Sequence, residues 1–184
     1  MLTPSRQKDI DFTFLTIAET KLNSSFPSEQ FRIEGYFSPD EFRRDRTYNN
    51  GGGMLVYIKK GTPCKRLKKF EQPEIETIVI EINISGQKWC IISIYRNEDV
   101  NPSTFFSYLS QSLDQIFNIY ENIIIMGDIN INSLDKNASK FTHLQDFCDS
   151  FDLRNLVKGP TCLQSENPTS IDMILTNKFR SFMH

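Results

Sequence analysis

Residues 122–130 read NIIIMGDIN and decide the fold of the chain. The first part of this segment is apolar on both faces, which is typical of a central strand buried inside a sheet. A strand projects residues i and i+2 to the same side, so Asp128 and Asn130 are expected to point together. In sheets flanked by helices, ligands commonly bind at the carboxyl ends of strands. The segment therefore predicts a buried strand that delivers two polar side chains to a ligand site.

A carboxylate beside a carboxamide suits the activation of water next to a phosphate group. Asp128 would accept a proton from the water, and the Asn130 amide would donate a hydrogen bond to a phosphoryl oxygen. Gly127 would let the backbone turn or approach a ligand closely. An Asx turn that closes the strand produces the same four residues. From these residues alone, the two interpretations are equally open.

The periodic spacing of apolar residues predicts further strands and helices before and after this strand. Residues 75–84 place an isoleucine at every second position from Ile78, and the next three residues are short enough to connect them to 88–95 as a hairpin. Asn101 and Pro102 supply a start for the first of two helices. Further strands are predicted at 11–19, 54–59 and 171–177, and helices at 104–120 and 141–152. These elements predict one mixed α/β layered domain over residues 1–184.

Composition narrows the class of protein. Of the 184 residues, 39% are hydrophobic and 24% charged, which is enough apolar material for a real core. The net charge of -2 excludes a chain that is basic throughout. No apolar run reaches the ~18 residues of a membrane-spanning helix, and the first residues lack a secretory apolar segment. The four cysteines form no C-x-x-C pair, so we expect buried free thiols in an intracellular, reducing compartment.

Residues 43–53, with the sequence RRDRTYNNGGG, are predicted to form an exposed, mobile loop that leads directly into the strand at 54–59. Basic residues concentrate from this loop to Lys69. They are either a solvated surface or a contact with a phosphate backbone.

Polar residues also stand at the ends of other predicted strands. Glu19 is either a ligand for a hard cation or a solvated residue at the start of a loop. Tyr95 and Arg96 are able to bind a phosphate, although a half-buried Tyr with an exposed Arg gives the same pattern. Asp172 lies in an apolar run and needs a cation, a metal or backbone donors as its partner.

Taken in order, these segments resemble a known family. They are IAETKL, RTYNNGGGMLVYI, WCIISIYR, IIIMGDININ, PTC and TSIDMILTN, and they span residues 17 to 177. This series resembles the endonuclease/exonuclease/phosphatase superfamily, which has the DNase-I-like fold. More narrowly, it is similar to the endonuclease domain of non-LTR (LINE-type) retrotransposons. The retroelement character rests on GDININ and on the downstream TSIDMILTN.

The resemblance implies a fold, a reaction and a set of roles. The fold is an α/β (α+β) layered sandwich of two packed mixed β-sheets flanked by helices. The reaction is phosphodiester hydrolysis of a DNA substrate with Mg²⁺ or Mn²⁺. The implied roles are Glu19 as metal ligand, Asp128 as activator of water, Asn130 as the residue that orients water or phosphate, Tyr95 as a contact to the scissile phosphate, Asp172 as support for the site, and Arg46 and Arg96 as contacts to nucleic acid.

The chain also departs from the family pattern at both ends. The family opens with a strand that carries an active-site Asn and closes with an S-D-H motif, and neither is present. We therefore expect a domain incomplete at both termini, with weakened or absent activity. The alternatives are a non-catalytic retroelement remnant that binds nucleic acid, and a phosphatase of the same superfamily, which the TSIDMILTN segment disfavours. A retroelement origin implies a reverse transcriptase domain in the full-length polyprotein and a nuclear location.

Overall fold

The computed structural model describes residues 12–46, 51–163 and 167–179. Its larger sheet has the strand order β4-β5-β6-β7-β9-β8, and its smaller sheet has the order β1-β3-β2. The larger sheet consists of β4 (Cys64–Arg66), β5 (Glu76–Ile84), β6 (Gln87–Tyr95), β7 (Asn122–Asp128), β8 (Arg154–Asn155) and β9 (Asp172–Thr176). The smaller sheet consists of β1 (Phe14–Ala18), β2 (Arg43–Arg44) and β3 (Met54–Ile58).

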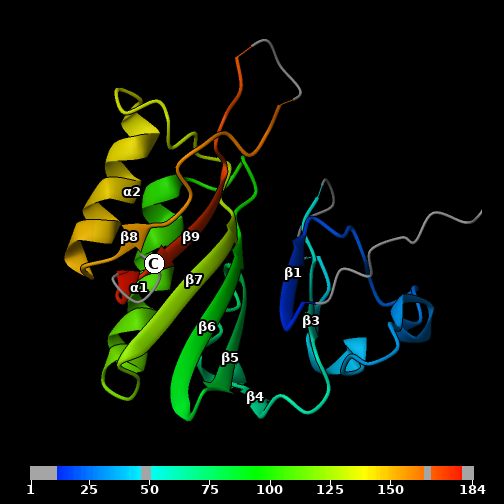
Figure 1. The fold of residues 1–184 in the computed structure, drawn as a ribbon. Coiled ribbons are helices and arrows are strands. Elements are labelled where there is room, and N and C mark those ends of the chain that lie inside the picture. Colours follow the sequence, from blue (N-terminus) through cyan, green and yellow to red (C-terminus); the bar gives the residue numbers. More distant parts are fainter. Residues whose placement is uncertain (1–11, 47–50, 164–166, 180–184) are drawn as a thin grey trace, which may run out of the picture.

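Helices α1 (Pro102–Phe117) and α2 (Ser139–Ser150) pack against the larger sheet, and three short 3-10 helices lie at Ser28–Phe31, Pro39–Glu41 and Lys68–Phe70. Figure 1 shows the two sheets facing each other, with α1 and α2 on the outer face of the larger sheet. The predicted sandwich of two sheets flanked by helices is therefore confirmed. No helix within the three described ranges is long and apolar enough to cross a membrane.

The predicted hairpin is formed by β5 and β6, which pair antiparallel along their whole length. Ser85 and Gly86 connect them, and both have positive φ, as a tight two-residue hairpin turn requires. The alternation in β5 sends Ile78, Ile80 and Ile82 into the core between the sheets. Val79 points to the other face, into the core beneath the helices. The period of two in this segment therefore fixes which side of β5 faces each layer.

Strand β7 is central, as its sequence predicts. It pairs parallel with β6 on one side and antiparallel with β9 on the other. The parallel pairing needs a crossover connection, and α1 supplies it. Ile123 and Ile125 pack beneath the helices, whereas Ile124 joins the core between the sheets. Both faces of β7 are covered, which explains why the strand is apolar on both.

Helix α1 begins as predicted. The Asn101 side chain accepts a hydrogen bond of 2.9 Å from the Ser103 N–H, and Pro102 occupies the first turn, where a missing N–H costs nothing. Its apolar stripe, which includes Leu109 and Leu113, is fully buried against the sheet. Tertiary packing of this stripe stabilises the helix more than intrinsic propensity does.

The prediction of an exposed loop over residues 43–53 is wrong at both of its ends. Arg43 and Arg44 form β2, which pairs with β3, and residues 51–53 are buried. These glycines lead directly into β3, as predicted. Because glycine lacks a side chain, its backbone packs where other residues would not fit. Residues 47–50 lie outside the described part of the chain.

The cysteines carry no disulfide. Cys90 and Cys148 are buried, as predicted, whereas Cys64 and Cys162 are only partly buried.

Gly127, near the end of β7, lies opposite Ile94 of β6 in the parallel register. Its φ is +143°, and a Cβ built on it would overlap the carbonyl oxygen of Ile94. Only glycine therefore allows β7 to approach β6 this closely at the end of the strand.

We expect Gly127→Ala to lower the free energy of unfolding by more than about 3 kcal/mol, because backbone strain and overlap act together. The control is Gly86→Ala, where φ is also positive, at +80°, but no atom lies within 4 Å of the new Cβ. It should cost only about 1 kcal/mol, the price of left-handed backbone alone. Urea denaturation measures both values. Equal losses in the two variants would show that the close approach to Ile94 carries no constraint.

Candidate active site

Four polar residues lie in one row across the larger sheet. Glu76 is the register partner of Tyr95, Tyr95 of Asp128, and Asp128 of Asp172. Residues directly opposite each other on neighbouring strands project to the same face. Tyr95 belongs to the core between the sheets, so this face is the one toward the smaller sheet. The row therefore aligns four functional groups from β5, β6, β7 and β9.

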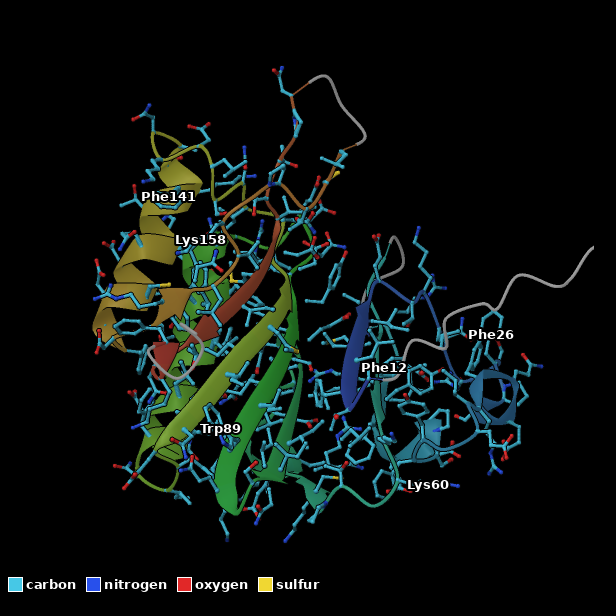
Figure 2. All side chains as sticks on the ribbon, viewed as in Figure 1. Phe12, Phe26, Lys60, Trp89, Phe141 and Lys158 are labelled. Atoms are coloured by element: carbon cyan, nitrogen blue, oxygen red, sulfur yellow. The ribbon has the colours of Figure 1, made fainter. Side chains whose placement is uncertain are left out.

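The smaller sheet brings Glu19 and the glycines to the same place. Glu19 follows β1, and the N–H of Lys21 donates to the Gly52 carbonyl at 2.8 Å. A Cβ on Gly51 would lie 3.3 Å from Glu19 Oε1 and 3.4 Å from Tyr95 Oη. Glu19 and Tyr95 therefore meet at one point between the two sheets. Trp89, near the start of β6, marks the end of the sandwich away from this point (Figure 2).

Asp128 is the carboxylate best prepared for proton transfer. Its pKa is raised to about 6, mainly by burial and also by the negative charges of Asp172 and Glu19, although the Asn130 N–H and the Arg96 charge act to lower it. The Asn130 N–H donates to Asp128 Oδ1 at 2.8 Å. A general base works best when its pKa lies near the working pH. Asp128 therefore suits the acceptance of a proton from water close to neutral pH.

Tyr95, in contrast to Asp128, is a group that keeps its proton. The residue is 3% exposed, and its burial, together with the negative charges of Glu19, Asp128, Glu76 and Glu98, raises the pKa of its phenol to about 12. The phenol therefore keeps its proton at neutral pH. A buried, protonated hydroxyl is a hydrogen-bond donor suited to an anionic oxygen.

The Asx turn predicted as an alternative for Asp128–Asn130 is present, and it does not compete with the site. The Asn130 N–H reaches back to the Asp128 carboxylate two residues earlier, which is the pattern of that turn. Asn130 has a φ of +51°, which Asn tolerates better than most residues. Its amide Nδ2 donates to the Arg96 carbonyl at 2.9 Å. The turn thus holds Asp128 and Asn130 together at the end of β7.

Arg96 does not lie where the sequence placed it. It was expected at a phosphate, or exposed beside a half-buried Tyr95, but it is 1% exposed. All three guanidinium nitrogens donate to backbone carbonyls. The prediction of a surface contact to nucleic acid is therefore contradicted by its burial. Arg46 is partly buried beside the undescribed residues 47–50, and its role stays a prediction.

Two residues of the site were missed by the sequence analysis. Glu76 is 2% exposed, and its Oε2 accepts a hydrogen bond of 2.6 Å from the Gly53 N–H. Asn97 is 9% exposed, and its Nδ2 would lie 3.3 Å from a Cβ on Gly51. Both carried a signal in the sequence. Glu76 lies two residues before Ile78, so it falls on the same face of the strand as the buried isoleucines of β5. Asn97 follows Tyr95 at the same spacing at which Asn130 follows Asp128.

The remaining site residues are more open to solvent. Asp172 is exposed, and its N–H donates to Thr161 Oγ1 at 3.2 Å. The Glu19 side chain is 46% exposed, and its Oε1 lies 3.9 Å from Lys21 Nζ. Within the described ranges, no group of three or more His, Cys, Asp or Glu side chains is arranged to hold a metal ion.

Comparison with protein families identifies the chain. A family model described as endonuclease-reverse transcriptase matches residues 89–181, which is half of the sequence. The chain belongs to this family. The matched segment contains Tyr95, Asp128, Asn130 and Asp172, four residues of the predicted site. The resemblance to the endonuclease/exonuclease/phosphatase superfamily is thereby confirmed.

Several solved structures have a similar fold. The endonuclease domain of TRAS1, a telomere-specific non-LTR retrotransposon, is 12% identical with a TM-score of 0.63, over 75% of this chain and 64% of that one. The 3'-5' exonuclease NExo of Neisseria meningitidis is 17% identical with a TM-score of 0.62, over 91% and 77%. The catalytic domain of Xenopus laevis APE2 is 15% identical with a TM-score of 0.60, over 92% and 75%. At these identities the likeness concerns the fold. The chain spans less than two thirds of the TRAS1 domain. A search of curated proteins found no match.

The raised pKa of Asp128 predicts how stability depends on pH. The folded-state pKa of about 6 exceeds the unfolded value of about 3.9, so the folded protein binds the proton more tightly. The stabilisation from this proton is fully present below pH 4 and is lost as the pH rises through 6. Asp128→Asn keeps the acceptor for the Asn130 N–H but removes the charge.

We therefore expect Asp128→Asn to be more stable than wild type at pH 7.5, by on the order of 1 to 2 kcal/mol after allowance for solvent screening. The difference should vanish near pH 4. Denaturant titrations at several pH values test this. A difference that is constant with pH, or that has the opposite sign at pH 7.5, would contradict the electrostatic account of the site.

Proposed function

We propose that this endonuclease-reverse transcriptase family chain is a divalent-metal-dependent phosphodiester hydrolase that acts on DNA, of retroelement origin. The observation that carries the proposal is the meeting of Asp128, Tyr95 and Glu19 at one end of the two sheets. There a carboxylate with a pKa of about 6 lies beside a protonated phenol. These groups match the two needs of the reaction, an acceptor for the proton of water and a donor to the phosphate.

The donor chemistry of the site fits a hard cation. Glu19 would hold Mg²⁺ or Mn²⁺, because its carboxylate is open to solvent and lies near enough to Asp128 for its charge to raise the pKa of that residue. Mg²⁺ keeps several waters and binds through one or two carboxylates plus substrate phosphates. Bound there, it would polarise the phosphoryl group. Because Glu19 is the single direct ligand proposed, the affinity for the metal without DNA should be weak.

The residues of the chain then divide the chemistry. Asp128 takes a proton from the attacking water while the water oxygen bonds to phosphorus. The bond from phosphorus to the leaving oxygen breaks, its electron pair stays on that oxygen, and the oxygen takes a proton from solvent. Tyr95 donates a hydrogen bond to a phosphoryl oxygen. Asn130 orients Asp128 through its N–H, and Asn97 presents its amide beside Glu19 and Tyr95. The negative charge of Asp172 raises the pKa of Asp128.

We infer the substrate and the partners from the family description and from proteins with a similar fold. The printed description of the family joins endonuclease and reverse transcriptase, and TRAS1 is a retrotransposon endonuclease. We infer by analogy that the substrate is DNA, that a reverse transcriptase domain belongs to the full-length protein, and that both work in the nucleus. Arg46, which lies just before the undescribed residues 47–50, would contact the phosphate backbone.

A second candidate is a domain that binds nucleic acid without cleaving it. One observation favours it: among the described side chains, no three acidic, His or Cys groups gather to hold a metal. Such a chain would keep the fold and the DNA contacts but would lack the cation that hydrolysis needs.

Nicking of supercoiled plasmid by the whole chain with Mg²⁺ separates the two candidates. We expect slow, metal-dependent nicking that falls by at least about 10²-fold in Asp128→Ala, because a group that acts only in the transition state is lost. The matched control is Asp114→Ala, an exposed Asp on α1. It should leave the rate unchanged.

Equal nicking by wild type and Asp128→Ala would mean that the nicking comes from a contaminating nuclease and that the chain itself lacks the proposed activity, which would contradict the proposal. DNA binding without nicking by wild type would support the second candidate.

A further inference from the structure

The guanidinium of Arg96 is buried at the end of β6 and bonded entirely to backbone. Nε donates to the Ile129 carbonyl at 2.6 Å, and Nη2 donates to the Asn130 carbonyl at 2.8 Å. Nη1 donates to the carbonyls of Asn97, at 3.1 Å, and of Glu98 and Val100. One side chain thus bonds to two separate stretches of chain, residues 97–100 and 129–130.

Both stretches carry groups of the site. Residues 97–100 follow β6 and include Asn97, and residues 129–130 follow β7 and include Asn130. The backbone of Arg96 adds two more links, since its N–H donates to the Asp128 carbonyl at 2.9 Å and its carbonyl accepts from Asn130 Nδ2. Side chain and backbone of one residue therefore connect the end of β6 to the end of β7.

We propose that Arg96 is the positioning residue of this site: it fixes the segments after β6 and β7 against each other, so that Asn97 and Asp128, which the Asn130 N–H holds, face the same point. The inference rests on the proposed hydrolase function and deepens it. Arg96 does not touch the substrate, because its guanidinium is buried and fully engaged with carbonyls. It acts through the backbone that it holds.

Arginine is suited to this task by its shape. Its planar guanidinium presents five N–H donors in a rigid fork, so it reaches carbonyls that lie in different directions. A Lys ammonium is a compact point charge that cannot span both segments. A buried charge is also seldom kept for stability alone, because apolar replacements are often as stable. The location of this charge beside Asp128 favours a role in the site.

The chain contains a matched control. Arg66, with a side chain 12% exposed, also ties two segments together, but away from the site. Its Nε and Nη2 bind Glu71, and its Nη1 donates to the carbonyls of Arg43 and Glu41. Loss of either arginine removes a buried guanidinium with several bonds. Only Arg96 contacts the segments after β6 and β7.

The first experiment is amide hydrogen exchange on the whole chain, with no DNA. In Arg96→Gln we expect exchange to rise at least about 10-fold at the amides of Asp99, Val100, Ile129 and Asn130, while the core of α1 stays protected. Arg66→Gln should leave these four amides unchanged. Unchanged exchange at them in Arg96→Gln would overturn the proposal. If Arg96→Gln does not fold, Arg96→Lys, which keeps the charge but not the fork, is measured in the same way.

The second experiment is plasmid nicking, normalised to folded protein, under the conditions used for wild type. For the Arg96 variants we expect kcat to fall at least about 10-fold, since small misplacements of reacting groups are costly, while KM for DNA stays within about twofold. Arg96→Lys should not restore kcat, and Arg66→Gln should match wild type. Unchanged kcat with raised exchange would overturn the positioning role. If wild type itself does not nick, the proposed function fails, whereas the exchange result still decides whether Arg96 fixes the two segments.

Discussion

The parallel pairing of β6 with β7 sets Tyr95 opposite Asp128, and the rest of the site is arranged around that pair. The pairing is close because Gly127 has no Cβ to meet the Ile94 carbonyl. Since the two strands run in the same direction, the segments that follow them leave the sheet at the same edge. The antiparallel neighbours β5 and β9 then add Glu76 and Asp172 to the row. A parallel pair inside a mainly antiparallel sheet thus gathers groups that are distant in sequence.

This arrangement concentrates negative charge at the expense of stability. Asp128 lies within the fields of Glu19 and Asp172, and it is partly removed from water, so its charged form is disfavoured. The same conditions keep the Tyr95 phenol protonated. Two neighbouring groups are thereby given different protonation behaviour, which is the usual way in which one site provides both an acceptor and a donor of protons. The burial and the neighbouring charges that would suit Asp128 to the proposed reaction therefore also lower the stability of the fold.

The sequence predicts much of the fold because local periodicity specifies it. The hairpin of β5 and β6, the central strand β7 and the capped start of α1 all depend on residues close together in the chain. Strands β2, β4 and β8 have two or three residues each, too few for any period. The polar residues at strand ends were recognisable, but their meeting depends on strand order. Glu76 was not recognised, and Arg96 was placed at the surface, because their hydrogen-bond partners, Gly53 and Ile129, lie 23 and 33 residues away in the sequence.

The central claim is that Glu19, from the smaller sheet, meets Asp128, from the larger one. The most direct test is an NMR titration of the Asp128 side-chain carboxyl in wild type and in Glu19→Gln, with Glu29→Gln as an exposed control on the first 3-10 helix. The account predicts a pKa of about 6 in wild type and in the control, and a lower pKa in Glu19→Gln, because one repelling charge is removed. An Asp128 pKa near the ordinary value of about 3.9 that is unaffected by Glu19→Gln would contradict it.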